Sequence, residues 1–274
     1  MSNLEFKTIE ELHRYLIDNK KSLIEQKKSV VKEGDSIPYV GVSYSVDKDV
    51  ADKAESAAEV VKEGEIQVKV VINTTNLIDS HMDCHMKGLW KKSLSEQKKL
   101  KLLKEHKATF ENVISDQVTA TAKTMTWKSL GYDMEGSTQA LIFDATIKEE
   151  RAPYMFGQYK NGYVDNHSVG MRYVTLYLCM NNDKSWAAEE KSNWDKYYSE
   201  VANKEIADQY GYFWAVTEAK IVEGSAVVFG SNYITPTLSV KQHVPNDTLK
   251  TEPLITEEVS IDMFKSELKT LLKN

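Results

Sequence analysis

The chain has 274 residues, of which 41% are hydrophobic and 28% charged, so it can bury a core and does not belong to the intrinsically disordered class. Its 35 basic and 41 acidic side chains give a formal net charge of -6, which excludes general binding to nucleic acid or to an anionic membrane. The two cysteines, Cys84 and Cys179, are too few for a disulfide framework, and we expect both to be packing residues in a reducing cytoplasm.

The first 64 residues are predicted to form a helical N-terminal extension. Apolar residues recur at helical spacing between residues 4 and 30 among many charges, which indicates an amphipathic helix, and a second helix is expected at Asp47–Lys62. No apolar run resembles a secretory signal or approaches the roughly 20 residues of a membrane-spanning helix. We therefore expect neither a signal peptide nor a membrane partner.

From Glu65 the pattern changes to strands. Ile66, Val68, Val70 and Ile72 alternate along a β-branched run, as in a strand with a buried face. Further β segments are predicted at Lys99–Glu105, Val118–Trp127, Thr138–Ile147, Ser168–Met180 and Tyr212–Phe229, with helical insertions at Ala152–Tyr159 and Trp186–Tyr210. The sequence thus predicts an α+β protein whose mostly antiparallel sheet core, residues 65–235, is surrounded by helices. The aromatic residues of the longer insertion are interpreted as packing.

After Ser231 the composition becomes polar, and three prolines between Pro236 and Pro253 are typical of a linker. A helix is expected from about Thr256 to Leu272. Residues 236–274 are therefore predicted to be a polar linker and a C-terminal helix. Both ends of the chain are expected to bury little apolar surface against the sheet core.

Two polar segments are candidates for ligand binding. His81, Asp83 and His85 would point to one side of an extended chain, as metal ligands do, but no fourth ligand is evident and a polar turn explains the same residues. The lysines between Lys87 and Lys107 are better explained by a solvated helix face and a protected strand edge than by phosphate binding. We expect no metal, no other cofactor and no nucleic acid.

A histidine and a serine stand at the ends of predicted strands. His106 closes one apolar segment, and Ser168 opens another, followed two residues later by Gly170, which would let a substrate backbone approach. A serine hydroxyl becomes a nucleophile when a neutral imidazole lies within about 2.6 to 3.2 Å and a third group orients that imidazole. Spacing along the chain does not show whether the two side chains meet.

Four segments in a fixed order carry a resemblance to a known family. They are Asp79–Asp83 with Gly88–Leu94, Leu102–His106 with Asn112–Ile114, His167–Met171, and Ile221–Val228. With these segments, residues 65–235 resemble the tailed-phage prohead proteases, the capsid maturation serine proteases that share a fold with the herpesvirus assemblins. The chain departs from the family at Ser115, where glycine is usual, and in the long Trp186–Tyr210 insertion.

The resemblance implies an assemblin-like, β-barrel-like core and a serine endopeptidase. Ser168 would attack the peptide carbonyl, His106 would take and return the proton, and Glu223 would orient the imidazole. Glu218, five residues earlier on the same predicted strand, would point to the opposite face and is the reserve for the acidic role.

The resemblance also implies substrates and a location. The substrates would be scaffold or delta segments of the major capsid protein and the enzyme's own termini, cleaved in the host cytoplasm inside the immature phage capsid, where the protease would self-associate. A non-enzymatic capsid scaffolding or interaction module, in which Ser168 and His106 are ordinary residues, is the competing hypothesis. Ser168 Oγ and His106 side by side in a groove would favour the enzyme, and a separation of more than about 8 Å, beyond hydrogen-bond reach, would favour the module.

Overall fold

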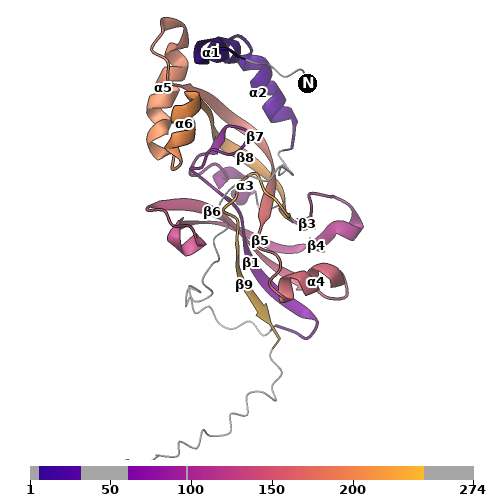
Figure 1. Ribbon diagram of the computed structural model, residues 1–274. Helices are drawn as coiled ribbons and strands as arrows, with labels where there is room; N and C mark the ends of the chain where they lie inside the picture. Colours follow the sequence, from indigo (N-terminus) through magenta and orange to yellow (C-terminus); the bar gives the residue numbers. More distant parts are fainter. Residues whose placement is uncertain (1–5, 32–60, 97, 244–274) are drawn as a thin grey trace, which may run out of the picture. The chain divides into compact units, whose positions relative to one another are not determined.

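The computed structural model describes residues 6–31, 61–96 and 98–243, which form a mixed α+β structure with mostly antiparallel strand pairs (Figure 1). The predicted α+β class is confirmed. Within these residues the strands form two sheets that do not close into a barrel, which corrects the barrel-like form implied by the resemblance. In the same part of the chain, no helix has the length and apolar composition needed to cross a membrane.

The first sheet has four antiparallel strands in the order β5-β6-β1-β9. They are β1 (Glu65–Thr74), β5 (Gln117–Thr126), β6 (Ser137–Lys148) and β9 (Thr237–Gln242). The alternation predicted for β1 is confirmed, because Ile66, Val68, Val70 and Ile72 are each at most 2% exposed. The threonines of the edge strand β5 face solvent.

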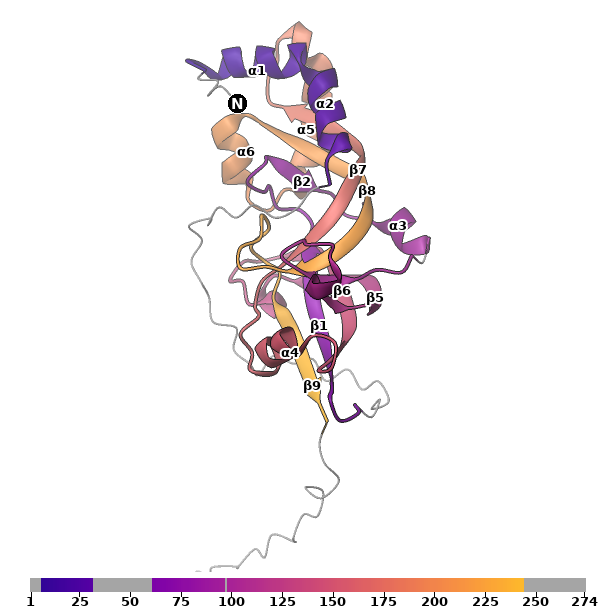
Figure 2. The same cartoon turned by 90° about the vertical axis from the view of Figure 1, so that its right-hand side faces the viewer.

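The second sheet is built around β8 (Tyr212–Ala226). Its strand β7 (His167–Met180) pairs with β8 in antiparallel fashion along its whole length, and the two form a long curved ribbon (Figure 2). On the opposite edge of β8, β2 (Asp83–His85) and β3 (Leu102–Lys104) pair with it in parallel, and β4 (Val113–Ser115) pairs with β3. The strand β8 therefore pairs directly with every other strand of this sheet except β4.

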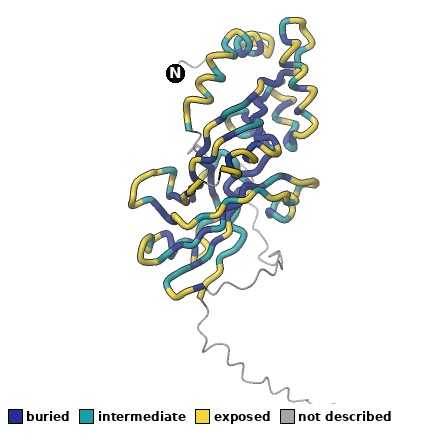
Figure 3. The backbone as a smooth tube through the Cα atoms, turned by 180° about the vertical axis from the view of Figure 1, so that it is seen from behind, coloured by how far each residue is buried: buried dark blue, intermediate teal, exposed yellow. Residues whose placement is uncertain are grey.

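The two sheets share the main hydrophobic core, which lies in the buried interior of Figure 3. Side chains of the first sheet pack directly against the backbone of the second at Gly224 of β8. A Cβ atom at this position would meet Phe143 at 2.7 Å and Ile72 at 2.9 Å, distances at which a side chain does not fit. This close contact fixes the end of β8 that carries the candidate site.

Helices pack near the other end of β7 and β8. The predicted insertion contains α5 (Ala188–Tyr197) and α6 (Lys204–Tyr210), and Trp194 stacks on Tyr198 with a centroid distance of 4.7 Å. The aromatic residues therefore serve packing, as expected. Cys84 and Cys179 are fully buried in the same cluster, and burial raises the pKa of both thiols, that of Cys179 to about 12.

The N-terminal residues form two helices, α1 (Ile9–Asp18) and α2 (Lys20–Ser29), where one was predicted. Asn19 ends the first and precedes the second. Leu16 is only 5% exposed and belongs to the main core, and Lys20 Nζ lies 2.6 Å from Glu190 of α5. This differs from the expectation that the N-terminal extension buries little apolar surface, because the helices contact β7 and α5.

The stretch after Ser231 also differs from the expectation. Residues 237–242 form β9, in which Val240 lies beside Val68 of β1, so this part of the predicted linker belongs to the first sheet. The remaining helices are α3 (Lys91–Ser95) and α4 (Pro153–Lys160), the latter matching the shorter predicted insertion. All of the predicted helix Thr256–Leu272, and nearly all of Asp47–Lys62, lie outside the described residues.

Candidate active site

His106 lies in a tight turn directly after β3. Glu105 and His106 have φ angles of 53° and 55°, in the left-handed region that residues other than glycine rarely adopt. The turn is attached to β8, because the backbone N–H of Glu105 donates to the carbonyl of Ala226 at 3.0 Å. Another bond joins it to the chain after β8, where the N–H of Val228 donates to Glu105 Oε1 at 3.1 Å. The imidazole is thereby held close to the end of β8.

His106 and Glu223 form a direct pair. His106 Nδ1 lies 2.7 Å from Glu223 Oε1, and their side chains are only 7% and 10% exposed. A carboxylate can only accept hydrogen bonds, so Nδ1 carries the hydrogen and Nε2 is the nitrogen able to accept a proton. This tautomer is the one required of a general base oriented by an acid.

Ser168 lies on the strand next to Glu223. In the register of β7 and β8, Ser168 is opposite Ser225 and Gly170 is opposite Glu223. Directly opposed residues, and residues two apart on one strand, point to the same face of a sheet, so Ser168 and Glu223 share a face. In the described part of the chain the Ser168 hydroxyl makes no hydrogen bond; Ser168 is placed by strand register and not by a contact with His106.

Glu218 lies in a different environment. It pairs with Thr175 of β7, and its Oε1 lies 3.3 Å from Lys92 Nζ of α3. This carboxylate is engaged outside the His106 turn. The geometry therefore favours Glu223 over Glu218 as the acidic partner of His106.

His167, which precedes Ser168, anchors the start of β7. Its ring is fully buried: Nδ1 donates to the carbonyl of Thr235 at 2.9 Å, and Nε2 accepts from the Tyr159 hydroxyl, also at 2.9 Å. The Thr235 hydroxyl accepts from the His167 N–H and donates to the His167 carbonyl. Burial lowers the pKa of His167 to about 4, so the ring is neutral and acts as a structural support for Ser168. The sequence interpretation missed this role.

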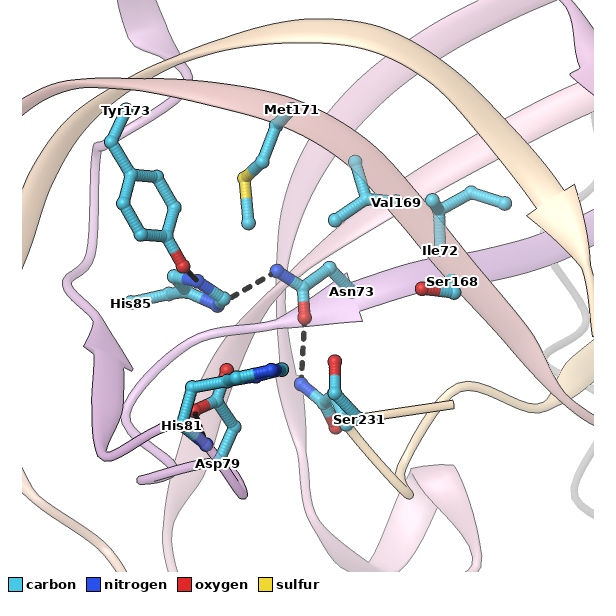
Figure 4. Close-up of a pocket in the computed structure, with 11 residues that line it drawn as sticks. Ile72, Asn73, Asp79, His81, His85, Ser168, Val169, Met171, Tyr173 and Ser231 are labelled. Atoms are coloured by element: carbon cyan, nitrogen blue, oxygen red, sulfur yellow. Dashed lines mark hydrogen bonds between the residues drawn. The ribbon is translucent and has the colours of Figure 1, made fainter. Parts of the chain in front are cut away.

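Two of the candidate metal ligands, Asp83 and His85, belong instead to a buried series of hydrogen-bonded side chains. Asn73 Nδ2 donates to His85 Nδ1 at 2.9 Å, and His85 Nε2 donates to the Tyr173 hydroxyl at 2.9 Å (Figure 4). That hydroxyl in turn donates to Asp83 Oδ2 at 3.0 Å. The directions follow from Asn73 Oδ1, which accepts from the Thr74 N–H and therefore is the oxygen. Among the described residues, no three His, Cys, Asp or Glu side chains form a group able to hold a metal ion.

A lysine of the N-terminal helices balances the negative charge of Asp83. Lys27 Nζ of α2 forms an ion pair with Asp83, whose side chain is 0% exposed, and also donates to the carbonyl of His81 at 3.3 Å. Desolvation, together with the charge on Asp83, raises the pKa of Asp79 to about 7. Neither Lys27, Asn73 nor Tyr173 was identified from the sequence, since their partners lie far away along the chain.

A small hollow lies between the hydrogen-bonded residues Asn73, His85 and Tyr173 on one side and Ser168 on the other. Its walls include Asn73, His81, His85 and Ser231, with Ser168 at one end (Figure 4). The enclosed space is about 10 Å³, room for about one water molecule. Ser168 thus borders this polar hollow and also lies on the strand next to Glu223.

Comparisons with known proteins give no relative of this chain. No family model matches it, and neither does any curated protein or solved structure.

Proposed function

We propose that the chain is a serine endopeptidase of the prohead protease type, with Ser168 as nucleophile, His106 as general base and acid, and Glu223 as the residue that orients the imidazole. One observation carries the proposal. His106 Nδ1 lies 2.7 Å from Oε1 of Glu223, and Glu223 lies on the strand next to Ser168 and on the same face of the sheet. Three residues that were selected from separate segments of the sequence thus come from the adjacent strands β7 and β8 and the turn after β3.

The chemistry follows from these positions. His106 Nε2 takes the proton of the Ser168 hydroxyl as Oγ bonds to the peptide carbonyl carbon, and Glu223 stabilises the imidazolium that forms. The imidazolium gives the same proton to the leaving amine as the peptide C–N bond breaks. Water then repeats the sequence on the acyl-enzyme and restores Ser168. The hydroxyl of Ser168 must approach Nε2 on substrate binding, as catalytic hydrogen bonds often do.

The resemblance extends the proposal to an assemblin-like core, to substrates and to location. Under it, the substrates are scaffold or delta segments of the major capsid protein and the enzyme's own termini, cut inside the immature phage capsid in the host cytoplasm by a self-associating protease. A peptide substrate needs no metal or cofactor with this set of residues. The alternative is a non-enzymatic scaffolding or interaction module, for which the exposed Phe110, 93% exposed, would be a contact residue.

A fluorophosphonate reagent tests the nucleophile directly. An activated serine oxygen bonds to phosphorus, fluoride leaves, and the histidine takes the serine proton. We expect labelling on the peptide containing Ser168, its loss in Ser168→Ala, and a loss of at least about 1,000-fold in labelling rate in His106→Gln. The matched control is Ser231→Ala, which removes a hydroxyl from the same hollow and should label at the wild-type rate.

Co-expression with the major capsid protein tests the substrate class. Capsid protein cut beside the wild type, and uncut beside Ser168→Ala, would support a maturation protease. The Ser168→Ala protein should unfold within about 1 kcal/mol of the wild type, because one small hydroxyl contributes little to packing. Labelling of another serine, or equal capsid cleavage by Ser168→Ala, would contradict the assignment. The absence of both labelling and cleavage in the wild type would favour the scaffolding module.

A further inference from the structure

Ser225 of β8 joins the two residues of the His106–Glu223 pair. Its Oγ donates to Glu223 Oε2 at 2.6 Å and accepts from the backbone N–H of His106 at 3.1 Å. The residue is 0% exposed. A single buried hydroxyl therefore contacts the side chain of the acid and the backbone of the base.

The bond to Glu223 fixes the orientation of the carboxylate. Oε1 faces His106 Nδ1 and Oε2 faces Ser225 Oγ, so both oxygens have a partner and rotation of the group would break two hydrogen bonds. An O–H to carboxylate distance of 2.6 Å is typical of a charge-assisted bond. A carboxylate that is 10% exposed requires such partners, since leaving it without them is costly.

The bond from His106 fixes the backbone of the base. The φ angle of 55° at His106 is unfavourable for a residue with a side chain, so the turn needs bonds that hold it. One comes from Ser225 Oγ, and the strand pairing of Leu103 with Ser225 places β3 beside it. The hydroxyl thus sets the position of the imidazole relative to the carboxylate.

We infer that Ser225 is a positioning residue for the His106–Glu223 pair, an inference that rests on the proposed protease function. Full burial excludes Ser225 itself as the nucleophile, because a substrate carbonyl cannot reach its hydroxyl, whereas Ser168 retains 6% exposure. Ser225 acts through its neighbours and touches no reacting atom. Its contribution is to hold the acid and the base in the geometry that proton transfer requires.

The test compares three variants of the full chain. Ser225→Ala removes the hydroxyl, Ser225→Thr keeps one, and Ser93→Ala is the matched control. The Ser93 hydroxyl is also buried and accepts from a backbone N–H of β8, that of Ile221 at 2.9 Å, but it takes no part in the hydrogen bonds that join His106, Glu223 and Ser225. With a cleavable peptide, we expect Ser225→Ala to lower kcat about 10- to 100-fold with KM within about 2-fold, since the residue acts on the chemical step.

A spectroscopic measurement provides a readout without substrate. The hydrogen on His106 Nδ1, bonded to Glu223, should give a low-field proton NMR signal that is absent in His106→Gln. We expect this signal to broaden or shift in Ser225→Ala and to remain in Ser225→Thr and in Ser93→Ala. Should Ser225→Ala fail to fold, Ser225→Cys provides a second variant, because cysteine keeps the shape of serine and is a weaker hydrogen-bond donor. We expect it to show the same loss of kcat and the same change in the NMR signal, both smaller in magnitude.

The possible outcomes distinguish the positioning role of Ser225 from the proposed protease function. Wild-type kcat together with an unchanged signal in folded Ser225→Ala would overturn the inference, and so would equal losses in Ser93→Ala. Full activity of Ser168→Ala would overturn the proposed function instead. The NMR comparison remains informative in that case, because it reports the His106–Glu223 contact whether or not the protein cleaves a peptide.

Discussion

Gly170 lies directly beneath the carboxylate of Glu223: a Cβ atom at position 170 would meet Glu223 Oε1 at 2.1 Å and its Cδ at 2.9 Å. No real side chain tolerates these distances. The position opposite Glu223 in β7 must therefore be glycine if the carboxylate is to reach His106. The glycine interpreted from the sequence as room for a substrate backbone makes room for an acidic side chain.

We therefore expect Gly170→Ala to break the contact between Glu223 and His106. The new methyl group displaces Oε1 from His106 Nδ1, and we expect kcat/KM on a peptide substrate to fall at least about 100-fold while the protein stays folded. The matched control is Gly157→Ala in α4, where an added Cβ has no neighbour within 4 Å. That variant should keep full activity and gain about 0.5 to 1 kcal/mol in stability, because alanine favours a helix. Equal activity of the two variants would refute the packing argument.

Much of the fold follows from local patterns. Alternating β-branched residues identified β1, and the apolar runs placed β6, β7 and β8 within a few residues of their observed bounds. The strand β9 has no such signal, because Thr237–Gln242 is half-buried and polar and becomes a strand only by pairing with β1. The packing of α1 and α2 on the sheet was likewise not predictable, since the charges that hold them in place have partners elsewhere in the sequence.

The candidate site, like the fold, was only partly predictable from local sequence patterns. The strand ends at His106 and Ser168 are visible in the sequence, but the position of one relative to the other depends on the register of three strands. Choosing between Glu218 and Glu223 by two-residue alternation is unsound, because Gly170 pairs with Glu223 and Met171 pairs with Ile221. This irregularity places Ile221 and Glu223, two residues apart, on opposite faces. The bonds of Ser225 leave no pattern in the sequence at all.

The ion pair between Lys27 and Asp83 should be the main electrostatic attachment of α2. The Asp83 side chain is fully buried, and that of Lys27 is 15% exposed. Lys27→Met keeps most of the apolar stem and removes the positive charge that lies against the buried carboxylate. We expect the free energy of unfolding at pH 7 to fall by about 3 kcal/mol, measured by urea denaturation.

Lys128→Met provides the comparison for this pair. Lys128 also forms an ion pair, with Glu135, but both side chains are largely exposed, at 58% and 88%. Water screens such a pair, so its loss should leave the unfolding midpoint unchanged. A similar midpoint for Lys27→Met would show that the buried pair does not stabilise the docking of α2. Restored stability in Lys27→Met combined with Asp83→Asn would identify the uncompensated charge as the cause.

Burial of His167 predicts how stability depends on pH. The pKa of His167 is about 4 in the folded protein and about 6.5 in the unfolded chain. Between these values the unfolded chain binds a proton that the folded protein does not, so acid favours unfolding. The contribution of neutral His167 is complete above about pH 6.5 and is lost as the pH falls toward 4. At pH 5 the loss should be about 2 kcal/mol, since each pH unit is worth about 1.4 kcal/mol.

Comparison with His167→Asn isolates this effect from other titrating groups. The amide of asparagine can donate to the Thr235 carbonyl in place of Nδ1 but does not titrate. The difference between the free energies of unfolding at pH 7 and pH 5 should therefore be smaller in the variant by about 2 kcal/mol, although the variant is less stable overall. An NMR titration in which the His167 ring gains its proton near pH 6.5 would contradict the prediction. Because His167 holds the start of β7, cleavage activity should decline together with folding below pH 5 if the neutral ring supports Ser168.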